Sequence, residues 1–216
     1  MKKFISLTLC MFLILSSFAA CSGDSDKKQD NDSGSSDATI TAEPNVSADS
    51  NIRKNKVHHV EMTIKDYGTI KIELYPDEAP ITVENFISLA KSGFYDGLSF
   101  HRLDKDFVLQ GGDPDGDGIG GSDKTIKGEF ISNGVQNTIS HKRGVISMAR
   151  TGDPNSASSQ FFFCLEDSTF LDGNYAAFGY VTDGMNIIDR IRDNTPESDS
   201  IPKDQQPVIE TIRVID

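Results

Sequence analysis

The segment FHRLDKDFVLQGGD, from Phe100 to Asp113, contains the side chains of this sequence that are best suited to chemistry. If it forms two short strands joined by a tight turn, it presents the guanidinium of Arg102, the ring of Phe107 and the amide of Gln110 near one another. Strand alternation also predicts that Phe100 and Arg102 share a face. The segment therefore has the shape of a binding site, but it does not by itself specify a reaction.

The composition limits the classes of protein that can carry such a site. A chain of 216 residues allows one domain of ordinary size plus appendages, and its 37% apolar and 25% charged residues are typical of a globular protein. The formal net charge of -12 argues against a nucleic-acid partner, because phosphate binding needs a basic patch and none is visible in the sequence.

Residues 1–20 are predicted to be a signal peptide rather than part of the fold. Lys2 and Lys3 precede an uncharged run that ends in small residues before Cys21. The sequence FAAC, which ends at Cys21, resembles the lipobox of bacterial lipoproteins, although Phe stands where that motif usually has Leu. The resemblance implies that Cys21 is acylated and becomes the new N-terminus. Ordinary secretion with cleavage nearby, or an uncleaved anchor, are the alternatives.

Residues 21–56 are predicted to be the lipid-attachment cysteine followed by a disordered tether. The segment is rich in Ser, Asp, Asn and Lys, so it cannot bury enough apolar surface to offset the entropy of ordering. Acyl chains on Cys21 would hold the protein on the extracytoplasmic face of a cell membrane, and the folded domain would comprise residues 57–216.

The pattern of residues 57–216 is that of a mainly β domain. Alternating apolar residues and intervening turns predict strands over residues 60–64, 70–74, 98–103, 107–111, 144–149, 160–165, 177–181 and 207–215. Two helices are expected: one begins at a Thr82 cap and stops at Gly93, and a shorter one is capped by Asp183. Without a βαβ alternation, this set of elements favours an antiparallel barrel.

Three ordered blocks in this domain resemble the signature sequences of the cyclophilins, the cyclophilin-type peptidyl-prolyl cis-trans isomerases. The blocks are FHRLDKDFVLQGGDP, GVISMART and SSQFFFCLEDSTFLDGNYAAFGYV, and the resemblance runs from about Val60 to the C-terminus. It implies a closed eight-stranded antiparallel barrel capped by two α-helices, with a peptide groove on its outer face. It also implies that the partners are proline-containing polypeptides.

The reaction of this family makes use of a fixed positive charge. An X-Pro bond rotates over a barrier of ~18 to 20 kcal/mol, because the nitrogen lone pair is delocalised into the carbonyl. Twisting the bond localises that pair on nitrogen, so a donor placed there stabilises the twisted state most. The resemblance assigns this role to Arg102, whose guanidinium is permanently charged. Neither a metal nor a cofactor is needed.

The resemblance also assigns a pocket for the proline ring. Phe107, Phe162 and Leu171 match its apolar walls, and Val108 stands where Met is common. Alternation along the strand places Phe162 on the face opposite to its two Phe neighbours, so that not all three can face the interior. With the groove that the resemblance implies, Phe162 is the one expected to face it.

The remaining matches surround this pocket. Gln110 matches the residue that orients Arg102, and Gln160 the residue beside the preceding carbonyl. Ala149 and Arg150 match the segment that binds the residue before proline, where many relatives have Asn in place of Arg150. Two further positions differ from the better-known eukaryotic members and affect binding of the cyclic peptide inhibitor: Phe170 replaces Trp, and Tyr175 replaces His.

Three other motifs have simpler interpretations. Cys164 lies in an apolar run and is expected to be a buried thiol rather than a nucleophile. Residues 113–118 match the first half of a calcium loop, but Lys124 stands where the loop needs Glu, so a polar turn is the preferred interpretation. His58 and His59 are adjacent on a strand and are expected to be structural or solvated.

Together these observations predict an exported, monomeric, lipid-anchored prolyl isomerase that assists the folding of exported or surface proteins. A proline-peptide binding module, whose turnover is incidental, is the alternative from a different functional class. A structural or adhesive lipoprotein would need repeats or a further domain, and the chain has neither.

Overall fold

A computed structural model describes residues 57–216 of the chain. The predicted signal peptide and the predicted Cys21 attachment site with its tether lie outside the described residues. Within residues 57–216, no helix is long and apolar enough to cross a membrane.

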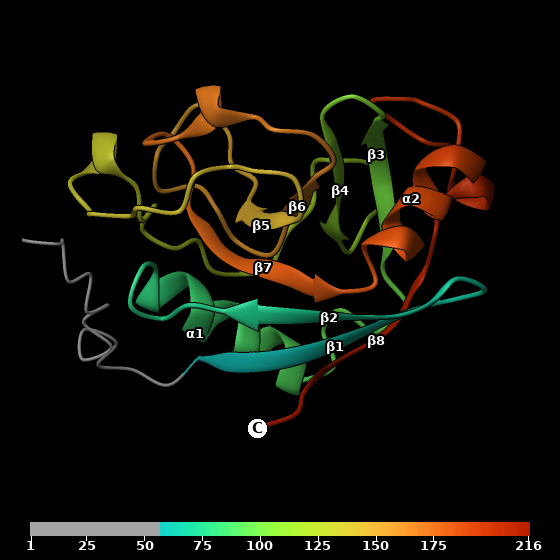
Figure 1. Cartoon of the computed structure of the whole chain (residues 1–216), viewed down its shortest axis with the longest axis horizontal. Helices are drawn as coiled ribbons and strands as arrows, with labels where there is room; N and C mark the ends of the chain where they lie inside the picture. The colour runs from blue at the N-terminus through green and yellow to red at the C-terminus, as the bar shows by residue number, and fades with distance from the viewer. Residues whose placement is uncertain (1–56) are drawn as a thin grey trace, which may run out of the picture. The chain divides into compact units, whose positions relative to one another are not determined.

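The described part contains eight strands and two α-helices (Figure 1). In chain order they are β1 (His58–Ile64), β2 (Gly68–Leu74), α1 (Pro80–Lys91), β3 (Ser99–Asp104), β4 (Val108–Asp113), β5 (Val145–Met148), β6 (Phe161–Cys164), β7 (Ala177–Asp183), α2 (Met185–Asn194) and β8 (Ile209–Val214). Every strand predicted from the sequence is present within a few residues, and all the pairings are antiparallel.

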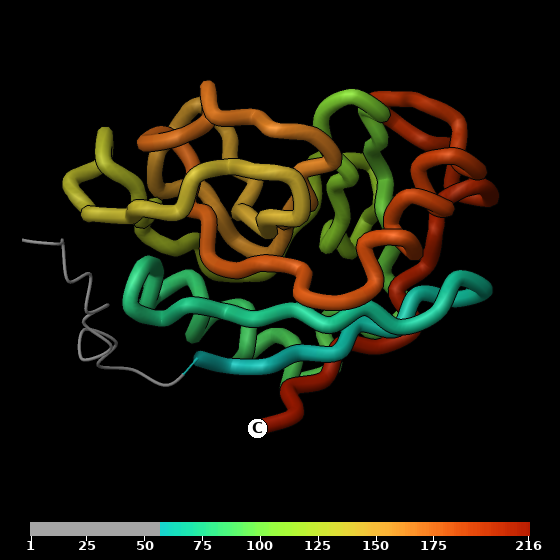
Figure 2. Tube along the Cα trace, viewed as in Figure 1, coloured from blue at the N-terminus to red at the C-terminus, as the bar shows by residue number. Residues whose placement is uncertain are grey.

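The strands form one curled sheet in the order β3-β4-β6-β5-β7-β2-β1-β8 (Figures 1 and 2). The prediction of a closed barrel is wrong, because the sheet ends at β3 and β8 and no strand ladder joins these two within residues 57–216. Near their first residues the two strands are joined by an isolated bridge between Ser99 and Val208 and by a 2.7 Å hydrogen bond from the Ile209 N–H to the Leu98 carbonyl. Pro207, which has no N–H, accepts a 2.9 Å hydrogen bond from the Phe100 N–H at this point. Beyond it, β3 pairs with the segment before β8: Leu103 and Ser198 exchange two 2.9 Å backbone hydrogen bonds.

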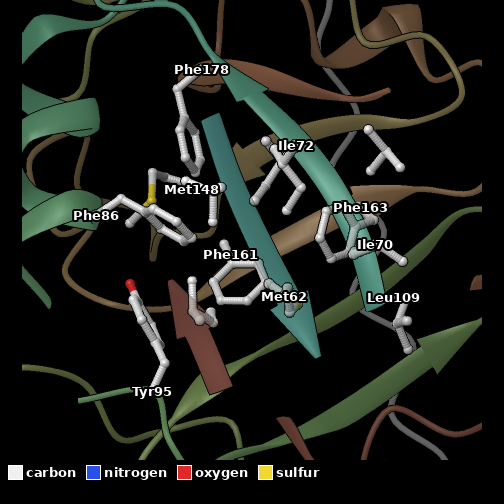
Figure 3. Close-up of a cluster of buried hydrophobic side chains, with 14 of the residues drawn as sticks. Met62, Ile70, Ile72, Phe86, Tyr95, Leu109, Met148, Phe161, Phe163 and Phe178 are labelled. Atoms are coloured by element: carbon white, nitrogen blue, oxygen red, sulfur yellow. The ribbon is translucent and has the colours of Figure 1, made fainter. Parts of the chain in front are cut away.

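The core fills the inside of the curl with apolar side chains from both helices and from the strands. Figure 3 shows Phe86 of α1 beside the rings of Tyr95 and Phe161, with centroid separations of 5.1 Å and 5.6 Å. Phe161 and Phe163 belong to this core, whereas Phe162 belongs to a second apolar cluster. The alternation predicted for this strand is therefore confirmed.

Helix α1 is capped by a residue that is distant in sequence. It begins at Pro80 rather than after a Thr82 cap, and no side chain at its own N-cap bonds to it. The buried carboxylate of Glu129 instead accepts hydrogen bonds from the N–H groups of Ile81 (3.1 Å) and Thr82 (2.8 Å). The expected stop is present, since Gly93 follows the helix with φ of 75°.

Helix α2 begins one residue later than predicted. Asp183 is the last residue of β7, and the N-cap of α2 is Gly184, which provides no side-chain hydrogen bond. Ile188 and Ile191 are buried, as their spacing predicts.

Candidate active site

The β3–β4 hairpin places Arg102 directly across from Gln110. The pairing contains a bulge, because Phe100 lies opposite Gly111 while Arg102 lies opposite Gln110, so His101 is an extra residue. The prediction that Phe100 and Arg102 share a face is consequently wrong. Phe100 points into the core, whereas Arg102 emerges on the outer face.

Arg102 is held by polar groups on two sides. Its Nε donates a 2.8 Å hydrogen bond to Asp199, and its Nη1 lies 3.5 Å from the Oε1 of Gln110. The Gln110 amide in turn donates to Gln160 at 2.8 Å, and the Gln160 amide donates to the carbonyl of Gly120 at 2.7 Å. This series of amides fixes the direction in which the guanidinium points.

Nine of the eleven predicted site residues, other than the attachment cysteine, line one small pocket of about 130 Å³. They are Arg102, Phe107, Val108, Gln110, Ala149, Arg150, Phe162, Leu171 and Tyr175. The other two lie at its border. Gln160 lines the neighbouring pocket, and Phe170, 72% exposed, stacks on Phe107 with a centroid separation of 5.4 Å.

The pocket combines an apolar wall with a cation. Val108, Phe162 and Leu171 are buried in the second apolar cluster. The Arg102 guanidinium carbon lies 5.9 Å from the centre of the Phe107 ring, at the opening of the pocket. This arrangement suits a ligand with a compact apolar ring next to a hydrogen-bond acceptor.

A buried polar group that sequence reasoning missed supports Phe162 from behind. The ring of His141 stacks on Phe162 at a centroid separation of 6.2 Å. Its Nδ1 lies 2.8 Å from Asp172, and its Nε2 lies 3.0 Å from the hydroxyl of Ser147. Side-chain hydrogen bonds link Ser147, His141 and Asp172 in the order found in a hydrolase triad. Ser147 is 0% exposed, however, so a substrate cannot reach it. Burial lowers the pKa of His141, with Asp172 opposing that shift.

A second pocket of about 470 Å³ adjoins the first and shares Gln110, Ala149 and Arg150 with it. Arg150 is the charged residue among those that line both pockets. Its Nε donates to the carbonyl of Asn174 at 3.0 Å and its Nη1 to the carbonyl of Thr151 at 2.8 Å. The guanidinium also lies over the ring of Tyr175, 4.5 Å from its centre.

The simpler interpretation of Cys164 agrees with the structure. Cys164 is fully buried, and burial raises the pKa of its thiol to about 12. Such a thiol is almost entirely protonated near neutral pH, which does not suit a nucleophile.

The acidic loop forms a polar turn. The carboxylate of Asp113 accepts hydrogen bonds from the backbone N–H groups of Asp115, Asp117 and Gly118, at 2.6 to 3.1 Å. No group of metal-ligating residues occurs among the described residues. His58 and His59 both contact Asp216 near the C-terminus.

A comparison with protein families identifies the domain. The sequence profile described as cyclophilin type peptidyl-prolyl cis-trans isomerase/CLD matches residues 59–214. The chain belongs to this family. It is a peptidyl-prolyl cis-trans isomerase of the cyclophilin type.

Individual relatives agree with this membership. A Schizosaccharomyces pombe peptidyl-prolyl cis-trans isomerase is 41% identical over 146 residues, which cover 67% of this chain and 92% of the relative. A Helicobacter pylori peptidyl-prolyl cis-trans isomerase is 46% identical over 133 residues, 60% of this chain and 78% of the relative.

Solved structures of the family share the fold. The crystal structure of a Cryptosporidium parvum cyclophilin type isomerase covers 74% of this cyclophilin and 99% of its own chain, with a TM-score of 0.67 and 30% identity. A second structure of that isomerase was determined in the presence of the dipeptide Ala-Pro, with a TM-score of 0.66.

Proposed function

We propose that Arg102 is the catalytic residue of this cyclophilin. The proline ring enters the pocket beside Phe107, Phe162 and Leu171, and the guanidinium donates a hydrogen bond to the prolyl nitrogen as the X-Pro bond twists. This bond is strongest when the lone pair is localised, so it lowers the barrier rather than merely binding the substrate.

The other site residues hold the substrate on either side of the twisting bond. Gln110 keeps the guanidinium aimed into the pocket, and Gln160 lies beside the carbonyl that precedes the proline. Ala149 and Arg150 hold the residue before the proline. Val108 and Tyr175 complete the walls of the pocket, while Phe170 extends the apolar surface beyond Phe107.

The observation that carries this proposal is the position of Arg102, at the border between a polar network and an apolar pocket. In a peptide assay that follows cis-to-trans conversion, Arg102→Ala should lose most of the activity at an unchanged thermal unfolding midpoint. Arg213→Ala removes an exposed arginine from β8 and serves as the control. If Arg102→Ala turned over as fast as the parent protein, the proposed mechanism would be wrong.

We further propose that the protein acts as a monomer outside the cytoplasm, where the lipid on Cys21 holds it to a cell membrane and the tether lets the isomerase reach exported or surface proteins. The charge-free run before Cys21 and the FAAC motif support this proposal. Mass spectrometry of the mature N-terminus should find an acylated Cys21, and Cys21→Ser should move the protein from the membrane fraction to the soluble fraction. An unmodified Cys21 in a protein that stays membrane-bound would contradict the proposal.

A proline-peptide binding module is the second candidate, because the apolar pocket could retain a proline ring without turnover. In that case, Arg102→Ala would keep its affinity for client proteins and would rescue the phenotype of a deletion. If the variant fails to rescue while still binding peptide, the enzyme proposal is favoured.

A further inference from the structure

The charged side chains that line the two pockets are both arginines, although the chain carries a formal net charge of -12. The residues that line the first pocket include Arg102 and Arg150 as their only charged members. Arg150 is the only charged residue that lines the second pocket, whose other walls are glycines, hydroxyls, amides and small apolar groups. Carboxylates lie close by, at Asp199 beside Arg102 and at Asp113 and Asp115 beside Gly120, so the positive charge left to attract an anionic group is that of Arg150.

The two arginines differ in how their charges are balanced. Arg102 forms an ion pair with Asp199 at 2.8 Å. Arg150 makes no ion pair with any residue in 57–216. Its guanidinium contacts the Asn174 and Thr151 carbonyls and the rings of Phe130 and Tyr175. Asp153 is a nearby carboxylate in sequence, but its Oδ1 accepts the backbone N–H of Asn155. Arg150 therefore keeps a positive charge that a ligand can neutralise.

The Arg150 guanidinium is also held in place before any ligand arrives. Two carbonyls fix two of its nitrogens, and the Tyr175 ring supports its flat face. Little side-chain entropy then remains to be lost when a carboxylate binds. The walls of the second pocket add hydroxyl groups that can donate to the same carboxylate, from Ser122, Thr125 and Ser158.

We infer that Arg150 is a specificity-determining residue, and that this cyclophilin prefers substrates with an acidic side chain one or two residues before the proline. The inference rests on the proposed function, which places the residue before the proline against Ala149 and Arg150. The proline ring occupies the smaller pocket, and the Asp or Glu side chain reaches across Arg150 toward the larger one.

The test compares peptides that differ at a single position and carry neutral ends. The first set is acetyl-Ala-Xaa-Pro-Phe-amide with Glu, Gln or Lys at Xaa, and a second pair carries Glu or Gln one residue earlier. Exchange NMR follows the cis-trans interconversion of each peptide and needs no coupling protease. At low salt, kcat/KM should be about two- to fivefold higher for Glu than for Gln in at least one pair, and lowest for Lys, as expected for a partly exposed ion pair. The preference should shrink as salt is added.

Variants of Arg150 separate the charge from its structural contacts. In Arg150→Gln the ratio of kcat/KM for the Glu peptide to kcat/KM for the Gln peptide should fall to about one. Arg150→Lys should keep part of the preference for the Glu peptide. Lys91→Gln changes the net charge by the same amount at an exposed position away from the two pockets, and should keep the whole preference. Because the ratio is measured within one variant, a partial loss of folding does not affect it.

Two results would overturn the inference: equal turnover of Glu and Gln peptides in the parent protein, or an unchanged preference in Arg150→Gln. Arg102→Ala with the Gln peptide tests the proposed catalytic role separately. If Arg102→Ala abolishes turnover while the parent shows no Glu preference, only the specificity of Arg150 is refuted.

Discussion

Acid should destabilise this domain well before its carboxylates are protonated, because two histidines are buried inside it. Burial lowers the pKa of His101 and of His141 below the ordinary histidine value of 6.5. His101 is 1% exposed, and neither of its ring nitrogens has a hydrogen-bond partner. Both side chains are therefore neutral in the folded protein at neutral pH.

The sign of the effect follows from proton binding. Below pH 6.5 the unfolded chain takes up protons on both histidines, whereas the folded protein takes them up only at lower pH. The contribution to stability is thus complete above pH 6.5 and is lost as the pH falls toward the folded-state pKa values. Each histidine adds a slope of up to about 1.4 kcal/mol per pH unit, so the pair gives at most about 3 kcal/mol per pH unit.

Urea unfolding at pH values from 5 to 8 measures this slope. The free energy of unfolding should fall as the pH is lowered below about 6.5, and His101→Gln or His141→Gln should each remove about half of the slope, whatever it does to the stability at pH 8. The control is Gln205→Ala, which changes an exposed side chain without a titratable group and should leave the slope unchanged. A stability that is flat between pH 5 and 7, or a slope that survives in both buried variants, would refute the reasoning.

Three further perturbations test the fold and the groove. Glu129→Ala removes the acceptor of two N–H groups at the start of α1 and should cost about 2–4 kcal/mol in urea unfolding, with Glu129→Gln losing less; equal stability of all three proteins would contradict the capping role. Gly112→Ala should be destabilised by at least about 1 kcal/mol, because φ is 83° and a Cβ would lie 2.7 Å from the Ser159 carbonyl. Phe170→Ala should raise KM about two- to tenfold with little change in kcat, since an exposed ring is lost beside Phe107; an unchanged KM would exclude it from the binding surface.

The parts of the fold that were predictable are those set by local pattern. Met62 and Ile72 alternate with polar neighbours, and a half-buried strand follows from that alone. The Glu129 cap was not predictable, because the residue lies 47 positions from Thr82 and only the folded chain brings them together. The missing ladder between β3 and β8 was not predictable for the same reason. The backbone groups of β3 bond to residues 198–207, which precede β8, and only the folded chain shows this.

The site was predictable to the extent that family motifs carry it. Alternation predicted that Phe162 faces away from its two Phe neighbours, and the motif blocks supplied the groove and the rest of the pocket. The bulge at His101 was missed because no local residue signals it, although it is what turns Arg102 outward. Asp199 and His141 were missed because Asp199 lies 97 residues from its partner Arg102 and His141 lies 31 residues from Asp172.

The covered edge of β3 has a consequence for a protein whose substrates are extended chains. Backbone groups from Ser198 to Val208 bond to this edge from Ser99 to Leu103, on the strand that carries Arg102 of the pocket. Figure 1 shows the segment that follows α2 running beside β3. An unfolded polypeptide that docks there finds the backbone partners along this stretch already taken, so it cannot extend the sheet as an additional strand. This edge thus adds no strand-like backbone pairing to the contacts that hold the substrate in the pocket, which favours release after its proline has rotated.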